Sequence, residues 1–75
     1  MKMSLDQALL KGIEAHKAGH FYEADCLYTA ILESHPQNPD ANHNMGVLAV
    51  DVGKPNEALR FFKRALEENQ SVAQF

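Results

Sequence analysis

Apolar residues recur along this chain at the three- and four-residue spacing of an amphipathic helix. In the first segment, Leu5, Leu9 and Ile13 recur at every fourth residue. In the second segment, the apolar stripe consists of Ala24, Leu27, Tyr28, Ile31 and Leu32. These spacings follow the helical period of about 3.6 residues, and no stretch alternates as a strand does. The pattern predicts four helices, over residues 5–18, 21–34, 39–52 and 55–69.

Residues that favour helix ends stand at the expected boundaries. Ser4 and Gln7 form a capping-box pattern at the start of the first helix. Asn38 is a good N-cap for the third helix. Gly19 and Gly53 follow the first and third helices, where the chain often needs a positive φ. We therefore expect two helical hairpins, each with a glycine in its turn.

The two hairpins repeat each other with a period of 34 residues. The matching pairs are Gly12 with Gly46, Gly19 with Gly53, Glu23 with Glu57, Ala24 with Ala58, Tyr28 with Phe62, Leu32 with Leu66 and Glu33 with Glu67. A fixed period with helix–turn–helix content is typical of a repeat architecture. We predict a single domain over residues 1–75, with a first repeat at 5–38, a second at 39–72 and the start of a truncated third unit at 73–75.

Small residues at one height on both helices of a hairpin let the two backbones approach closely. Gly12 and Ala24 serve the first hairpin, and the equivalent pair serves the second. A side chain larger than alanine there would overpack the contact at a cost of roughly 1–3 kcal/mol. We expect the bulky residues Tyr28 and Phe62 to fill the space toward the neighbouring hairpin.

These features together resemble the tetratricopeptide repeat. The residues that carry the resemblance in both units are Gly12 and Gly46, Gly19 and Gly53, Ala24 and Ala58, and Tyr28 and Phe62, while Phe21, Pro36 and Ala65 match in one unit each. The units depart from the family pattern at Ile31, Pro55 and Gln70, and at Ala8 and Asn42, where an aromatic residue is usual. The resemblance covers Leu5 to Val72 and implies an all-α fold, in which two helix–turn–helix repeats form four antiparallel helices and a short right-handed α-solenoid.

The resemblance also implies a non-enzymatic protein–protein interaction module, a scaffold that binds a protein or peptide segment in a concave groove. The groove positions that it carries over are Leu9, Ile13, His16, Lys17, His43, Asn44, Val47, Val50 and Asp51, with Asp6 and Asp40 beside them. Its apolar positions would form a floor suited to a helix or an apolar peptide. Chaperone-binding members use lysine, asparagine and arginine side chains to bind the carboxylate of their ligand. Two of these positions are Leu9 and Ile13 here, and neither side chain can bind a carboxylate, so a chaperone C-terminus is an unsuitable ligand.

Composition narrows the class of partner. The net charge is −3, and the seven Lys and Arg residues are scattered, which argues against nucleic acid and against a basic membrane-surface helix. The apolar runs are too short for a membrane span or a signal peptide, so we expect a soluble, cytoplasmic protein. The single cysteine, Cys26, excludes an internal disulfide and is interpreted as a packing or surface residue.

No pattern in the chain indicates catalysis, a cofactor or a metal. His16 and His20 have a spacing that suits a metal on a continuous helix, but Gly19 is expected to end the helix between them. The sequence Asn42-His43-Asn44 has no nucleophile in a catalytic arrangement, and the glycines do not form a phosphate loop. We therefore predict no catalytic residue, no cofactor and no metal ligand.

Two alternatives to the groove hypothesis remain open from the sequence. The chain is a structural repeat that self-associates as a homodimer, through the apolar residues Phe61, Phe62, Leu66 and Phe75. Alternatively, it is the N-terminal appendage of a larger bacterial enzyme, because the segment from Pro39 onward also resembles repeats that precede transferase domains.

Overall fold

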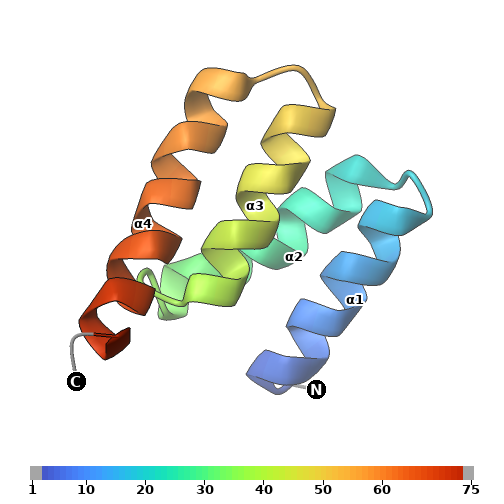
Figure 1. Ribbon diagram of the computed structural model, residues 1–75. Coiled ribbons are helices and arrows are strands. Elements are labelled where there is room, and N and C mark those ends of the chain that lie inside the picture. The colour runs from blue at the N-terminus through green and yellow to red at the C-terminus, as the bar shows by residue number, and fades with distance from the viewer. Residues whose placement is uncertain (1–2, 74–75) are drawn as a thin grey trace.

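The computed structural model describes residues 3–73, with side chains described as far as Glu67, and this part of the chain contains four helices and no strand. The helices are α1 (Leu5–Lys17), α2 (Phe21–Ser34), α3 (Pro39–Asp51) and α4 (Pro55–Ala73). Figure 1 shows α1 beside α2 and α3 beside α4, as two helical hairpins. We call them the first and second hairpin. The predicted all-α class with helix–turn–helix repeats is confirmed.

The helix boundaries agree with the prediction to within one residue, except at the end of α4. We expected that helix to end near Asn69, and it continues to Ala73. The equivalent helix α2 ends before Pro36, whereas Gln70 stands at the equivalent place and lies inside α4, because glutamine does not interrupt a helix. Ala73, where a third unit was expected to begin, is thus the last residue of α4. Gln74 and Phe75 lie outside the described residues, and the division at residue 38 stays a prediction.

Local signals in the sequence explain where the helices begin and end. The Ser4 hydroxyl accepts a hydrogen bond from the Gln7 backbone N–H at 3.1 Å, and the Gln7 side chain accepts one from the Ser4 N–H at 3.0 Å. The Asn38 side chain accepts a hydrogen bond from the Ala41 N–H at 2.9 Å at the start of α3. These contacts satisfy backbone donors that have no partner within the helix. Gly19 and Gly53 adopt φ of 83° and 84° in the two turns, as predicted.

The core lies where the first hairpin meets α3. Helix α3 contacts each of the other three helices. Its side chains Met45 and Leu48 join Ala15, Ala24 and Tyr28 in one buried cluster. Leu9, Ile13, Leu32 and Phe61 are half-buried against this cluster. Because one cluster draws on both hairpins, neither hairpin buries its apolar surface alone, as expected for stacked repeats.

Each of the two hairpins contains a close contact between a glycine and an aromatic ring. A Cβ added to Gly12 would lie 2.5 Å from Cε1 of Tyr28, and one added to Gly46 would lie 2.6 Å from Cε1 of Phe62. The rings therefore pack on the glycine of their own hairpin, a contact that we did not predict from the sequence. Tyr28 also fills the space toward the second hairpin, because it belongs to the core cluster with Met45 and is fully buried.

Asn42 replaces the aromatic residue that the repeat pattern favours near the start of α3, and its side chain is fully buried. Its amide donates hydrogen bonds to the backbone oxygens of Pro36 and Asn38, both at 3.0 Å. The Asn42 Oδ1 atom has no hydrogen-bond partner among the described residues. The polar substitution thus joins α3 to the end of the turn that follows α2, which helps to set how the second hairpin lies on the first.

Candidate functional site

Six of the predicted groove residues lie together in a hollow between α1 and α3. We call it the α1–α3 hollow, and its volume is about 430 Å³. The predicted residues in it are Ile13, His16, Lys17, Asn44, Val47 and Asp51. Gly19, Phe21 and Tyr28 complete its lining. Residues from both repeats therefore converge on one surface, although they lie about one repeat apart in the sequence.

A polar contact crosses the hollow from the first hairpin to the second. The His16 Nε2 atom lies 2.5 Å from Oδ2 of Asp51. The His16 side chain is 13% exposed and its ring packs edge-on against Phe21, with the ring centroids 5.6 Å apart, whereas Asp51 is 45% exposed. A contact with one partner in solvent contributes about 1 kcal/mol or less to stability. Its structural effect is to hold the end of α1 against the end of α3, at one edge of the hollow.

The wall of the hollow offers both apolar and polar groups. Ile13 and Val47 are half-buried and present aliphatic surface from the two facing helices. The Asn44 amide donates to the backbone oxygen of Asp40 at 2.8 Å, within its own helix. Lys17 is exposed and forms no ion pair with any residue that the structure describes. The site can therefore hold an apolar group beside a group that accepts hydrogen bonds.

Tyr28 adds a buried polar group that sequence analysis did not place in the groove. Its hydroxyl has no hydrogen-bond partner among the described residues, and the residue is fully buried. Burial raises the pKa of the Tyr28 phenol, because the charged form would lose its water. We interpreted Tyr28 as a core residue only. Its place in the lining follows from the packing of its ring against Gly12, and no one-dimensional pattern indicates that direction.

Three of the nine predicted groove residues lie elsewhere. Leu9 is half-buried against the core cluster. His43 lines a different hollow of about 450 Å³ between α3 and α4, where its ring centroid lies 5.6 Å from that of Phe62. Val50 is 50% exposed and lines none of these hollows. Of the two neighbouring acids, Asp6 is exposed on α1 and Asp40 lines the same hollow as His43.

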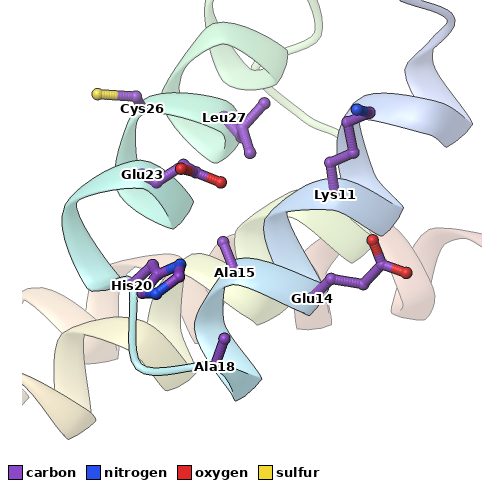
Figure 2. Close-up of a pocket in the computed structure, with 8 residues that line it drawn as sticks. All are labelled: Lys11, Glu14, Ala15, Ala18, His20, Glu23, Cys26 and Leu27. Carbon is purple, nitrogen blue, oxygen red and sulfur yellow. The ribbon is translucent and has the colours of Figure 1, made fainter.

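A larger hollow, of about 540 Å³, lies on the outer side of the first hairpin between α1 and α2. Figure 2 shows its lining, in which Lys11 and Glu14 come from α1 and Glu23 comes from α2. Cys26 is exposed and its sulfur points away from the hollow, which agrees with its interpretation as a surface residue. This hollow contains charges of both signs and was not predicted from the sequence.

The histidine pair that was considered for metal binding is divided as expected. His16 lies on α1, Gly19 turns the chain with positive φ, and His20 is the N-cap of α2. Among the described residues, no group of three or more His, Cys, Asp or Glu side chains is placed to hold a metal ion. None of the helices described here is both long enough and apolar enough to pass through a lipid bilayer.

Stacked helical hairpins with a glycine in each turn define a class of protein, the α-helical repeat proteins. Residues 27–60 match the family model described as tetratricopeptide repeat. The matched segment starts in α2 and ends in α4, so it contains all of α3 and the turns on both sides. The chain therefore contains a tetratricopeptide repeat, and the family assignment made from the sequence is confirmed. No solved structure matches the chain.

The family assignment indicates a general class of function. The tetratricopeptide repeat is a protein–protein interaction module, and the four-helix architecture agrees with that class. Which face of this chain contacts a partner is a separate question, which depends on the chemistry of the surfaces described above.

Proposed function

We propose that the α1–α3 hollow binds a segment of a partner protein, and that the chain acts as a non-enzymatic interaction module. The observation that supports this proposal is the convergence of six predicted groove residues from two repeats on one hollow. A surface built from both hairpins exists only in the folded array, so a partner that binds there recognises the folded protein.

The chemistry of the hollow defines the kind of segment that fits. Ile13 and Val47 offer an aliphatic wall to an apolar side chain. The exposed Lys17 supplies a hydrogen-bond donor to an oxygen acceptor that enters the hollow. We therefore propose a segment that carries an apolar side chain next to a carboxylate or an exposed backbone carbonyl.

The test begins with a displayed library of random peptides, selected on the wild-type protein. The best peptide is then titrated into protein labelled for nuclear magnetic resonance. We expect the amide signals of Ile13, Lys17 and Val47 to move with a common saturation curve. Signals that move only on other surfaces would contradict the proposal, and so would repeated selections that yield no specific peptide.

The matched pair of variants is Val47→Glu and Val52→Glu. Val47 lines the hollow, whereas Val52 caps α3, is 44% exposed and lies outside the lining. A glutamate at residue 47 places a charge on the apolar wall, so we expect loss of peptide binding with unchanged helicity. Val52→Glu should bind as the wild type does. Binding that survives Val47→Glu would refute the proposed site.

A further inference from the structure

The two outer faces of the repeat pair differ in chemistry, which becomes clear when each residue is compared with its equivalent 34 positions away. In the second hairpin, Met45 and Leu48 pack against the first hairpin and are 8% and 3% exposed. Their equivalents in the first hairpin are Lys11 and Glu14. Both are exposed at the charged hollow on the outer side of α1 and α2 (Figure 2). The outer face of the first hairpin is therefore polar where the matching inner face is apolar.

The outer face of the second hairpin has the opposite character. In the first hairpin, Tyr28 and Leu32 pack against the second hairpin. Their equivalents are Phe62 and Leu66, and Leu66 is 58% exposed. Leu59 adds to this surface, three residues before Phe62 on α4, and is 67% exposed. We call Leu59, Phe62 and Leu66 the α4 stripe, since their spacing places them on one side of the helix.

We propose that the α4 stripe is the contact surface of a symmetric dimer, in which it packs antiparallel against the α4 stripe of a second copy of this chain. The stripe is complementary to itself. Leu59 and Leu66 stand on either side of Phe62, so an antiparallel pairing places Leu59 of one copy near Leu66 of the other, with the two Phe62 rings at the centre. The same residues then serve both copies, as a two-fold axis requires.

Leu59 distinguishes this arrangement from the stacking of another hairpin of the same kind. Its equivalent in the first hairpin is Asp25, which stays exposed and accepts a hydrogen bond from Thr29 although the second hairpin covers its neighbours. A third hairpin stacked in the same way would therefore leave residue 59 in solvent. A helix that lies along α4 covers Leu59 together with Phe62 and Leu66.

The charged outer face of the first hairpin excludes a second arrangement, in which two copies stack head to tail. Head-to-tail stacking would bury Lys11 and Glu14 in the places that Met45 and Leu48 occupy inside the molecule. Burying charged groups without compensation is strongly unfavourable. Association is therefore closed at two copies and does not continue into a filament.

The α4 stripe consists of three side chains, whereas a standard interface contains about 20–30 residues on each partner. We therefore expect a weak dimer that dissociates on dilution. The measurement is the mass of the full chain by sedimentation equilibrium, over roughly a hundredfold range of concentration starting in the low micromolar. The mass should rise from the 8.4 kDa monomer toward twice that value and then stop rising.

The diagnostic variant is Leu59→Asp, which installs the residue that the first hairpin has at the equivalent place. We expect it to remain monomeric over the whole range, with the helicity of the wild type, and Leu66→Glu should behave in the same way. The matched control is Leu10→Glu, because Leu10 is 57% exposed on α1 and lies outside the stripe. This control should dimerise like the wild type.

Three outcomes would overturn the proposal. They are a wild-type protein that stays monomeric, a dimer that survives both stripe substitutions, or a mass that continues to rise beyond the dimer. Binding of a synthetic helical peptide by a monomeric wild type would assign the stripe to another partner and would also overturn it. The result is independent of the proposed groove function, since Val47→Glu leaves the α4 stripe unchanged and Leu59→Asp leaves the α1–α3 hollow unchanged.

Discussion

The contact between Gly12 and Tyr28 predicts a large effect from the smallest possible substitution. In Gly12→Ala, the new Cβ would lie 2.5 Å, 2.9 Å and 3.2 Å from three ring atoms of Tyr28. The ordinary separation of two carbon atoms in contact is about 3.5–4.0 Å. Tyr28 is fully buried in the core cluster, so its neighbours restrict the movement of its ring more than they restrict the ring of the half-buried Phe62. We therefore take the overpacking cost near the upper end of its usual range, about 3 kcal/mol.

The helix itself favours the same substitution, because alanine is better than glycine in a helix interior by about 1 kcal/mol. The expected net loss in the free energy of unfolding is then about 2 kcal/mol. For a domain of this size, that loss lowers Tm by about 8–16 °C. The assay is urea unfolding followed by circular dichroism, with thermal unfolding of the same samples as a second measurement.

The chain contains two matched controls for this prediction. In Gly46→Ala, the new Cβ meets Phe62 at 2.6 Å, but Phe62 is only half-buried and its ring can move outward. We expect a net change near zero there. In Gly19→Ala, no atom lies within 4 Å of the new Cβ, and φ is positive, so the loss of about 1–2 kcal/mol comes from the backbone alone.

A second substitution separates crowding from other causes. Tyr28→Leu removes the ring that the new Cβ meets, so Gly12→Ala should cost less in that background, by about 1–2 kcal/mol. Gly19→Ala should cost the same in both backgrounds. The reasoning is wrong if Gly12→Ala is as stable as the wild type, or if Gly46→Ala is the more damaging of the two helical substitutions.

Further predictions follow from the side chains of Tyr28, Asn42 and Asn38. Tyr28→Phe removes a buried hydroxyl that has no partner, so stability at neutral pH should be unchanged or rise by about 1 kcal/mol, and a clear loss in urea unfolding would show that the hydroxyl is paired. Burial raises the pKa of Tyr28 in the folded state, so the unfolded state loses this proton first as the pH rises through about 10. The stability of the wild type should therefore fall in this pH range relative to that of Tyr28→Phe. Parallel stability profiles of the two proteins against pH would contradict this. Asn42→Ala removes two hydrogen bonds to backbone oxygens and should cost about 2–3 kcal/mol in the same assay, whereas a loss below about 0.5 kcal/mol would mean that water replaces the amide. Asn38→Ala removes the N-cap of α3 and should cost about 1 kcal/mol, with Gln37→Ala, an exposed neighbour outside the cap, as the control.

The sequence by itself determined the elements and their order. Helix starts could be predicted because capping is local: Ser4 and Asn38 bond to backbone groups three residues away. Glycines at equivalent places predicted both turns, because positive φ is a property of a single residue. The end of α4 was predicted wrongly, because no helix-breaking residue stands where Pro36 follows α2, and the helix continues to Ala73.

Only the tertiary structure decided which candidate residues share a site. The 34-residue repeat places His16 and Val50 at equivalent positions, and likewise Lys17 and Asp51, so the pattern alone treats both pairs as one groove. The fold treats the two pairs differently, because it brings His16, Lys17 and Asp51 to the α1–α3 hollow and leaves Val50 outside it.

The packing of one hairpin on the other also decided which aromatic and apolar side chains are covered and which remain exposed. Periodicity identifies the side of a helix that is apolar, but not the neighbour that will cover it. Tyr28 is covered by α3, whereas the equivalent Phe62 is only half-buried and the neighbouring Leu66 remains exposed. In a repeat protein each unit buries its surface on the next, so equivalent residues have different environments that depend on the place of their unit in the stack.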